Sequence, residues 1–404
     1  MRTLFLLSIS SLLFSCTNCV KNEITFSNPS SFERMDEQIS LLRSDSVFKN
    51  CANDMLPLIL CNEDTIPSQL LDTNGDSQWD RLLMNLNFAA LEIKKVEIVF
   101  VESTAAPVYA ARTNFRFAKK KNNGKEFEEC TTANRLAGKN TDTTQKYFQF
   151  EGPGWENDKV AFRNYFDERN GIDIFGKKLP GMILDRVGVD QNYHELQSWG
   201  MDILKVGSSL GAGAIAVKNV DSLYRVSQYK ESNFDGLSEG ILQTTFNLNY
   251  NNFMVDSQLI NIHHKVEISA GKYFYNNEIS ISEMPKNMQL VVGIVNLHSD
   301  TMYQENYLNH SIFYTHDKQA FNGEYLGMAV VSKKTDCAGF YKTPNVNSDV
   351  TNTFAVQFVS TTLPLSYRFY ACWELNDKKF SNREAFISFL KNEVDRSENP
   401  IVRK

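Results

Sequence analysis

Alternation of apolar and polar residues recurs along most of the chain and predicts antiparallel β-strands. In the clearest case, residues 242–250, the even positions are Leu, Thr, Phe, Leu and Tyr, and the odd positions are Gln, Thr, Asn and Asn. Such a strand buries one face and turns the other toward water. Further strands are predicted at residues 95–101, 273–282, 290–297, 325–332, 354–360 and 367–373.

Two segments have helical patterns instead. Ser30 and Glu33 have the spacing of a capping box, and apolar residues from Phe32 to Leu42 recur at helical spacing, which predicts a short helix over residues 31–43. A second capping box at residues 381–384 precedes an apolar stripe and predicts a C-terminal helix. We therefore expect an all-β fold, with a small N-terminal helix and β element at residues 31–115. A large antiparallel sandwich with one terminal helix should follow at residues 116–404.

The start of the chain has the pattern of an export signal. A short basic start precedes the apolar run Leu4–Phe14, which is shorter than the roughly 20 residues that a membrane-spanning helix needs. Leu13-Phe14-Ser15-Cys16 resembles the bacterial lipobox, so we expect removal of residues 1–15, lipid on Cys16 and a polar tether over residues 16–30. The alternative is a plain signal peptide followed by a chance cysteine. Thr17, where an aspartate would favour inner-membrane retention, favours an outer membrane lipoprotein on its periplasmic or cell-surface side.

Composition narrows the classes of partner. The net charge of −6 supplies no basic field for a phosphate backbone, so nucleic acid is not an expected partner. The chain is rich in aromatic residues, with 28 Phe and 16 Tyr, which suit a β-sheet core and also flat platforms for sugar rings. Six cysteines besides Cys16 permit disulfides in an oxidising compartment, but their irregular spacing does not predict a zinc site.

One loop has the pattern of a calcium site. Oxygen-bearing side chains recur there at Asp72, Asn74, Asp76 and Asp80. That spacing resembles a calcium-binding loop, although Ser77 replaces the glycine of the sharp turn and Leu83 replaces the closing glutamate. The alternative is a hairpin turn built by Asn74-Gly75. No other cofactor is predicted.

A glycine- and proline-containing loop leads to Trp155 and Glu156 and then to a predicted strand over residues 160–166. Alternation places Arg163 and Tyr165 on one face of that strand, opposite its apolar face. An arginine side chain in this position is suited to hold a carboxylate through two hydrogen bonds. The alternative is an ordinary surface arginine that pairs with a nearby acidic residue.

A later loop contains the candidate proton carrier. His194 follows Tyr193 in a polar loop, and imidazole is suited to proton transfer near neutral pH, although a structural histidine is the alternative. The glycine-rich run at residues 207–213 lacks the Lys-Ser/Thr of a phosphate-binding loop. Motifs of serine hydrolases and zinc proteases are likewise absent from the sequence.

Taken in order, these motifs resemble a family of exported proteins, domain-of-unknown-function family 4861, over about residues 55–395. The resemblance rests on the Gly-Pro-x-Trp-Glu-x-Asp loop at 152–158, Arg-x-Tyr at 163–165, Tyr-His at 193–194, Gly-x-Asp at 200–202 and the glycines at 211–213. The chain departs from the family pattern at Gly154, where a bulkier residue is usual, and before Gly200, where an acidic residue is usual.

The resemblance implies a galactose-mutarotase-like supersandwich and a role in polysaccharide utilisation by Gram-negative bacteria, with an acidic saccharide as ligand. We expect β-elimination or epimerisation beside a carboxylate. The expected catalytic residues are His194, Tyr165 and Glu156. The expected substrate-binding residues are Trp155, Arg163, Tyr193 and Asp202. Another form of the enzyme would be a hydrolase that uses Glu156 and Asp202 as its pair of carboxylates. The alternatives are a non-catalytic glycan-binding lipoprotein, with Trp155, Trp199 and Trp373 as its platform, and a structural surface protein.

Overall fold

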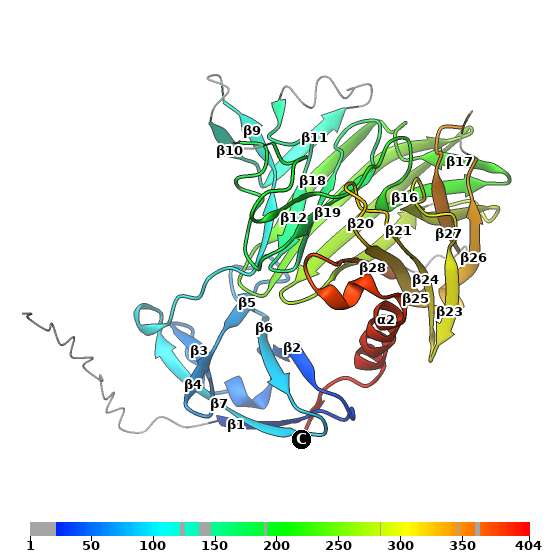
Figure 1. Cartoon of the computed structure of the whole chain (residues 1–404). Helices are drawn as coiled ribbons and strands as arrows, with labels where there is room; N and C mark the ends of the chain where they lie inside the picture. Colours follow the sequence, from blue (N-terminus) through cyan, green and yellow to red (C-terminus); the bar gives the residue numbers. More distant parts are fainter. Residues whose placement is uncertain are drawn as a thin grey trace, which may run out of the picture.

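The computed structural model describes residues 22–121, 126–136, 147–189, 192–282, 284–344, 346, 348–359 and 364–404. A small β unit formed by the N-terminal part of the chain lies beside a much larger β-sandwich (Figure 1). The predicted all-β class is confirmed, because the paired strands are antiparallel throughout these sheets. Cys16 and the rest of residues 1–21 lie outside the described residues.

The small unit consists of two sheets that share an apolar core. Their strand orders are β29-β1-β7-β3-β4 and β2-β6-β5. The strands are β1 (Asn22–Ser27), β2 (Arg34–Leu42), β3 (Met55–Cys61), β4 (Asp64–Ile66), β5 (Ser68–Leu71), β6 (Arg81–Phe88), β7 (Ile93–Glu102) and β29 (Val402–Arg403). Two short 3-10 turns belong to this part of the chain, η1 (Ser46–Phe48) and η2 (Ser103–Ala105).

Two predictions for this unit are wrong. The expected tether contains β1, whose Ile24 and Phe26 are buried in the core of the unit. The expected helix over residues 31–43 is strand β2. The β2–β6 register shifts between Arg34 and Glu37, and Asp36 has a φ of 49°. The shift breaks the two-residue alternation, so the apolar positions of this irregular strand imitate helical spacing.

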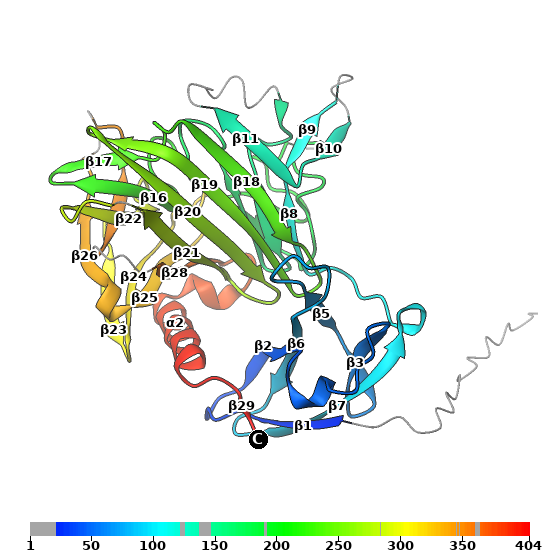
Figure 2. The same cartoon turned by 180° about the vertical axis from the view of Figure 1, so that it is seen from behind.

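The sandwich has one wide sheet on one side and two narrower sheets on the other. The wide sheet has the order β11-β18-β19-β20-β21-β28-β25-β24-β23. Its strands are β11 (Thr132–Leu136), β18 (Glu231–Ser238), β19 (Gln243–Val255), β20 (Gln258–Ser269), β21 (Phe274–Ser282), β23 (Tyr303–Tyr307), β24 (His310–Asp317), β25 (Leu326–Lys333) and β28 (Leu365–Trp373). Figure 2 shows β18, β19 and β20 of this sheet in front.

The facing layer contains two five-stranded sheets, β15-β14-β13-β12-β8 and β17-β16-β22-β27-β26. The first comprises β8 (Thr113–Arg116), β12 (Gly154–Asn157), β13 (Val160–Asn164), β14 (Ile172–Lys177) and β15 (Gly200–Asp202). The second comprises β16 (Ala212–Asn219), β17 (Ser222–Arg225), β22 (Met288–Val295), β26 (Cys337–Lys342) and β27 (Thr353–Phe358). The small ribbon β9 (Ala118–Lys120) and β10 (Phe127–Glu129), and the turn η3 (Lys334–Asp336), complete this part of the fold.

Aromatic side chains form much of the core between the two layers. Trp155 and Phe162 of the narrow sheet stack with ring centroids 5.8 Å apart, and Tyr275 of the wide sheet meets Trp155 edge-on at 5.2 Å. The odd-numbered polar residues of β19 point away from this core, as the alternation predicted, since Phe246 and Leu248 are buried within it. At β19 the wide sheet therefore has one apolar and one polar face, whereas at β24 and β28 its outer face has a second apolar cluster that includes Ile312, Tyr370 and Cys372.

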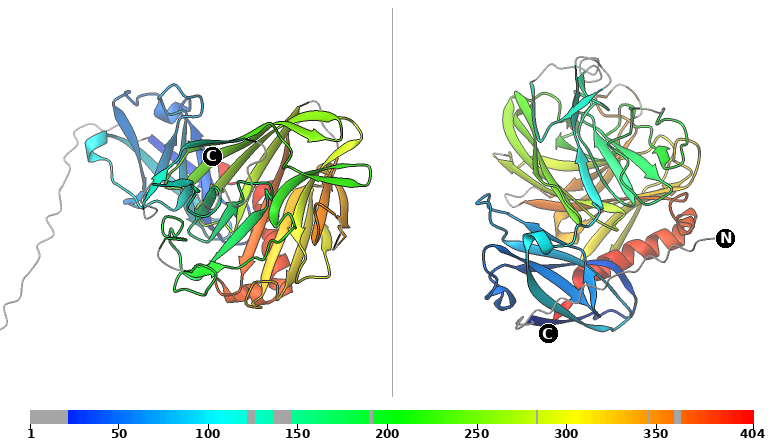
Figure 3. Two further views of the ribbon diagram at one scale, coloured as in Figure 1. Left: turned by 90° about the horizontal axis from the view of Figure 1, so that it is seen from above. Right: turned by 90° about the vertical axis from the view of Figure 1, so that its left-hand side faces the viewer.

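The predicted C-terminal helix is confirmed as α2 (Arg383–Glu398), which follows the turn η4 (Lys378–Ser381). Its N-cap is Asn382, whose side chain accepts a hydrogen bond from the Ala385 N–H. The helix packs Phe386 into the apolar cluster on the outer face of the wide sheet, where only a glycine at position 327 leaves room for its ring. Figure 3 (right) shows α2 lying between the sandwich and the small unit.

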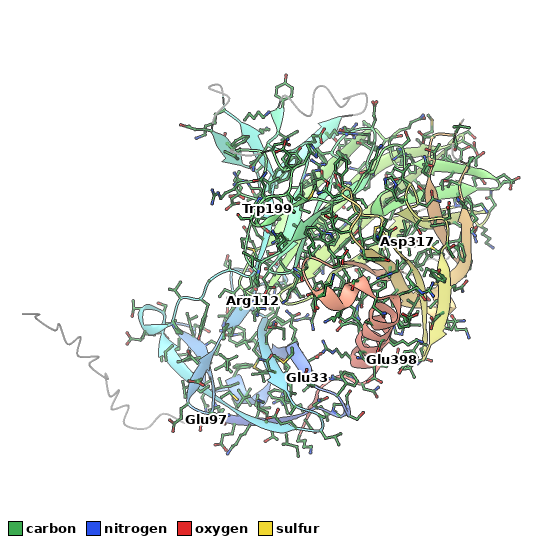
Figure 4. The ribbon with its side chains drawn as sticks, viewed as in Figure 1. Glu33, Glu97, Arg112, Trp199, Asp317 and Glu398 are labelled. Carbon is green, nitrogen blue, oxygen red and sulfur yellow. The ribbon has the colours of Figure 1, made fainter. Side chains whose placement is uncertain are left out.

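Arg112 joins the two units where the chain passes between them, and Gln69 of the small unit also donates to the Gln243 carbonyl oxygen of the sandwich at 2.9 Å. Arg112 forms ion pairs of 2.6 Å with Asp36 of the small unit and with Asp158 of the sandwich. Figure 4 labels Arg112 at this junction. Because β8 begins at Thr113, the sandwich starts slightly earlier than predicted, and β29 returns the end of the chain to the small unit. None of the described helices is long and apolar enough to cross a bilayer.

Candidate functional site

The sequence-predicted site residues gather on the outer face of the narrow sheet β15-β14-β13-β12-β8. Strand pairing places Arg163 directly opposite Asp173, and Phe175 directly opposite Asp202. Phe162 and Ile174 alternate with these residues and enter the sandwich core. The prediction that Arg163 lies on the face opposite the apolar side chains is therefore correct. The covering loop, described at residues 178–189 and 192–199, lies over part of this face.

Arg163 is the centre of a buried polar network rather than a free surface group, since its side chain is only 1% exposed. Its Nη2 donates to Asp173 Oδ2 at 2.5 Å and to the Tyr165 hydroxyl at 2.8 Å. Glu151 Oε2 lies 3.3 Å from Nη1, and Asp202 Oδ2 lies 3.6 Å from Nη2. With three carboxylates already around it, this guanidinium is not available to hold the carboxylate of a ligand.

Tyr165 and Asp173 are equally enclosed. The Tyr165 hydroxyl donates to Asp173 Oδ2 at 2.9 Å, and burial raises the pKa of Tyr165 well above its ordinary value. Burial and the neighbouring Asp202 charge raise the pKa of Asp173 to about 7, in spite of the opposing effect of Arg163. A buried phenol with a raised pKa stays protonated near neutral pH, and the Tyr165 hydroxyl already donates to Asp173, so the predicted proton-transfer role of Tyr165 is not supported by its position.

His194 reaches solvent at the edge of this network. Its side chain is 58% exposed, and Nδ1 lies 3.4 Å from Asp202 Oδ2. The hydrogen bond that the His194 imidazole donates to Asp202 raises the pKa of His194, although partial burial opposes the shift. The Tyr193 ring lies 4.3 Å from the imidazole, and its hydroxyl accepts from Arg163 Nη1 at 3.4 Å. Of the three residues predicted to be catalytic, His194 alone is accessible to a ligand.

Glu156 has a structural role in place of the predicted catalytic one. Its carboxylate is fully buried and forms a 2.5 Å ion pair with the equally buried Lys177. Its oxygens also accept backbone N–H bonds from Ile183 and Leu184, at 2.9 Å each. The Lys177 ammonium donates to the Gly181 carbonyl oxygen at 2.7 Å as well. Glu156 and Lys177 thus fix the start of the covering loop.

The predicted tryptophan platform is also wrong in two of its three members. Trp155 is fully buried, because β12 is an inner strand and its indole enters the sandwich core. Trp373 is buried in the same core. Trp199 is the exception, since it is half-buried and packs on the small apolar cluster beneath the covering loop. Figure 4 labels Trp199 on this side of the sandwich.

A pocket of about 280 Å³ opens beside Trp199 in the covering loop. Its walls include Tyr193, Trp199 and Arg186, together with the apolar side chains of Ile183 and Val187. Arg186 is exposed and forms no ion pair with any residue that the structure describes. Tyr193 connects the pocket to the buried network, since its hydroxyl accepts from Arg163 and its ring contacts His194.

Sequence reasoning missed several members of this site. Asp173 was detectable in principle, because Asn170-Gly171 is a hairpin signal that would fold the next strand back onto Arg163. Lys177 ends the same strand, which is separated by β13 from the strand that contains Glu156, so no local pattern pairs the two residues. Arg186 lies in an irregular loop, and no local pattern distinguishes it from other surface arginines.

The Asp72–Asp80 segment connects the antiparallel strands β5 and β6, in agreement with the hairpin alternative. Asp72 accepts backbone N–H bonds from Gly75 and Ser77, at 2.7 Å each, so its carboxylate already closes the turn. Among the described residues no three acidic, histidine or cysteine side chains converge as a metal site. Calcium binding by Asp72, Asn74, Asp76 and Asp80 stays a prediction.

Comparison with known proteins identifies relatives of this chain. It is 25% identical over 268 residues to the uncharacterized protein P7 of Formosa agariphila, which covers 61% of this chain and 65% of that protein. Among solved structures, an α-mannosidase from Enterococcus faecalis V583 matches 95% of this chain and 46% of its own, with 8% identity and a TM-score of 0.47. A glycosyl hydrolase family 38 protein from Enterococcus faecalis matches similarly, with 8% identity, 47% of its own chain covered and a TM-score of 0.48.

The family model of a domain of unknown function, DUF4861, matches residues 26–402. That range includes both β units and every motif on which the resemblance rests, from the Gly152 loop to the glycines that end at Gly213. The chain therefore belongs to the DUF4861 family.

Proposed function

We propose that this protein binds or acts on acidic, uronate-containing saccharides, in the pocket beside Tyr193 and Trp199. The observation that carries the proposal is a pocket lined by the Trp199 indole and by the Arg186 guanidinium, which has no ion-pair partner among the described residues. Tyr193 also lines this pocket, and its ring contacts His194, which pairs with Asp202. Aromatic faces suit the apolar sides of sugar rings, and an arginine fork suits a carboxylate. The polysaccharide-utilisation setting that the family resemblance implies agrees with such a ligand.

Arg186 takes over the carboxylate-binding role first expected of Arg163. Arg163 is surrounded by three carboxylates, whereas Arg186 is exposed in the pocket and has no ion-pair partner among the described residues. A uronate carboxylate would supply that partner through two charge-assisted hydrogen bonds. Arg163 instead holds Asp173, Asp202 and Tyr193 in place behind the pocket.

His194 is the group that would move a proton. In an elimination, a base takes the proton from the carbon beside the carboxylate, the electron pair forms a double bond to the next carbon, and the glycosidic oxygen leaves with a proton. An imidazole whose pKa is raised by Asp202 is well placed to give or take such a proton near neutral pH. Asp202 positions the ring and is itself largely enclosed.

The second candidate function is saccharide binding without chemistry. It is favoured by the same Trp199 platform and by the burial of Tyr165 and Glu156, which leaves His194 without a second accessible predicted catalytic group. The two functions differ in product formation, because elimination creates an unsaturated uronate that absorbs ultraviolet light and binding creates no product.

A panel of uronate oligosaccharides and matched neutral oligosaccharides tests the proposal. In Arg186→Gln, we expect uronate affinity to fall by the roughly 1.5–3 kcal/mol of a charge-assisted contact, with neutral sugars unaffected. Arg383→Gln, a change of the same kind on α2, is the matched control and should bind like wild type. For an enzyme, His194→Gln should lower turnover by about 10²–10⁴-fold and leave affinity nearly intact.

The pH dependence separates a positioned histidine from an incidental one. Asp202→Asn removes the main cause of the raised His194 pKa, so the limb of the pH–rate profile that belongs to His194 should move to lower pH. Unchanged uronate binding in folded Arg186→Gln would contradict this location of the site. If no oligosaccharide of the panel gives an ultraviolet-absorbing product, elimination is contradicted and saccharide binding without chemistry is the function that remains.

We also propose that the protein is held at the outer membrane by lipid on Cys16. The support is the lipobox, and the first described strand begins at Asn22, a few residues after it. Cys16→Ala should move the protein from the detergent phase to the aqueous phase in a detergent-partition assay. Full retention of the variant in the detergent phase would contradict lipid anchoring.

A further inference from the structure

The polar face of the wide sheet contains a second pocket, on the opposite layer of the sandwich from the candidate site. Its volume is about 310 Å³, and strands β20, β21, β25 and β28 form its floor. A smaller hollow of about 150 Å³ shares Glu267, Asn276 and Arg368 with it and continues toward α2 and β2. We propose that this groove binds a saccharide chain through an anionic substituent, a carboxylate or a sulfate ester.

Strand register places the charged residues of the groove in two adjacent rows across the sheet. In the first row, Glu267 faces Asn276, which faces Arg368 on the next strand. In the second row, Lys265 faces Glu278. Since side chains two residues apart on one strand share a face, all five project from the same polar face. Figure 2 shows this side of the sheet.

Arg368 lies at the centre of the groove and is half-buried there. It faces Asn276 on one side and Val331 on the other, and its guanidinium carbon lies 5.0 Å from the centre of the Phe274 ring. That cation–π contact holds the guanidinium in place, and the charges of Glu393 and Glu267 act on it without a direct ion pair. Withdrawing a charged group from water is unfavourable unless a partner of opposite charge replaces the water.

Two lysines supply further positive charge to the same pocket. Lys333 is exposed and Lys265 half-buried, and both contribute to the lining with Arg368. None of the three cations has a carboxylate oxygen within 4.0 Å in the described part of the chain. An oxyanion in the pocket would meet three cations. Because the net charge of the whole protein is −6, the protein as a whole repels an anion, and the attraction comes from this groove.

The other lining groups favour a saccharide over a free inorganic anion. Glu267 accepts from Asn276 Nδ2 at 3.0 Å, and Glu278 is exposed beside it. Carboxylates would repel a small anion, but they are good acceptors for the hydroxyl groups of a sugar. An acidic or sulfated sugar unit requires cations for its anionic substituent and hydrogen-bond acceptors for the neighbouring hydroxyl groups. The groove has both kinds of group.

This groove and the candidate site lie on different layers of the sandwich, so they do not share a residue. The groove would bind its ligand through its own residues, and it extends the proposed ligand class to a second place on the molecule. Two separate contacts with one long polymer would increase its overall affinity without improving that of a short oligosaccharide.

Calorimetric titration of the full chain with a uronate oligosaccharide, a sulfated neutral oligosaccharide and an unsubstituted neutral one tests the proposal. The key variant is Lys265→Gln with Lys333→Gln, and Lys94→Gln with Lys95→Gln on β7 of the small unit is the control with the same loss of charge. The measurements use the Arg186→Gln background, in which the candidate site is weakened. The groove variant should bind the anionic oligosaccharide about 10- to 100-fold more weakly, and the control should not change.

The identity of the oligosaccharide that binds assigns the substituent. Binding of the uronate compound alone assigns a carboxylate, and binding of the sulfated compound alone assigns a sulfate ester. Equal affinity in the groove variant and its control, or no binding of either anionic compound, overturns the proposal. These outcomes leave the proposed function untouched, because its test depends on Arg186 and His194. Lys333→Glu, a single change at an exposed position, repeats the test if the double variant unfolds.

Discussion

Lys177→Met is expected to lower the free energy of unfolding by about 3–5 kcal/mol, the cost of leaving one charge of a buried pair without its partner. Both members of the pair are fully buried, and their charged atoms lie 2.5 Å apart. Methionine fills a similar volume, so the loss comes from the isolated Glu156 carboxylate rather than from a cavity. Urea denaturation measures the change.

Two further variants separate the ion pair from other effects. Glu156→Gln combined with Lys177→Met removes both charges and should recover part of the lost stability, since contacting residues are energetically coupled. Lys95→Met breaks an ion pair with Glu23 that is nearly as short, at 2.6 Å, but exposed, and should cost under about 1 kcal/mol. A cost for Lys177→Met as small as that of Lys95→Met would show that the buried pair does not hold the covering loop.

Arg163→Gln is expected to be similarly destabilising, by about 3–5 kcal/mol, because it removes the cation that several buried carboxylates share. The sequence predicted that a change of Arg163 would weaken ligand binding. Because the side chain is buried, we expect the change to lower the stability of the fold instead. Arg163→Lys keeps one positive charge but not the two-pronged geometry, and it should lie between wild type and the glutamine variant.

The loss in Arg163→Gln should depend on pH. The folded-state pKa of Asp173, about 7, is already above the ordinary value of about 4, so its ionisation costs stability as pH rises between these values. Arg163 opposes that shift, and its removal raises the Asp173 pKa further. The melting temperature of the variant should therefore fall more steeply than that of wild type from pH 5 to pH 8. Parallel curves would mean that Asp173 is not the group that responds.

Local patterns were sufficient for most strands and for the terminal helix. The alternation in β19 correctly assigned its buried and polar faces, because a half-exposed antiparallel strand shows both faces in its sequence. The same reasoning failed in β2, where an irregular register and a positive φ at Asp36 disturbed the alternation. Alternation predicts a strand only while its register is regular.

The candidate site shows a different limit. Alternation placed Arg163 on the non-core face of β13, which is correct, but the exposure of that face depends on what covers it. The cover is a loop more than ten residues later in the chain, held by Glu156 and Lys177. Contacts of this kind arise from tertiary packing and have no period in the sequence, so a buried structural arginine and a ligand-binding arginine look alike.

Because β29 pairs with β1, the first sheet of the small unit is complete only after the last described strand has been made. Phe26 and Ser27 face Arg403 and Val402, and the Lys404 N–H donates to the Thr25 carbonyl oxygen at 2.9 Å. Strand β1 is made early by the ribosome, whereas its second neighbour, β29, is made after every other strand that the structure describes. Until translation of residue 404, one edge of β1 keeps unpaired backbone groups that are open to pairing with another chain. A nascent chain that stalls before β29 is therefore the form most at risk of aggregation.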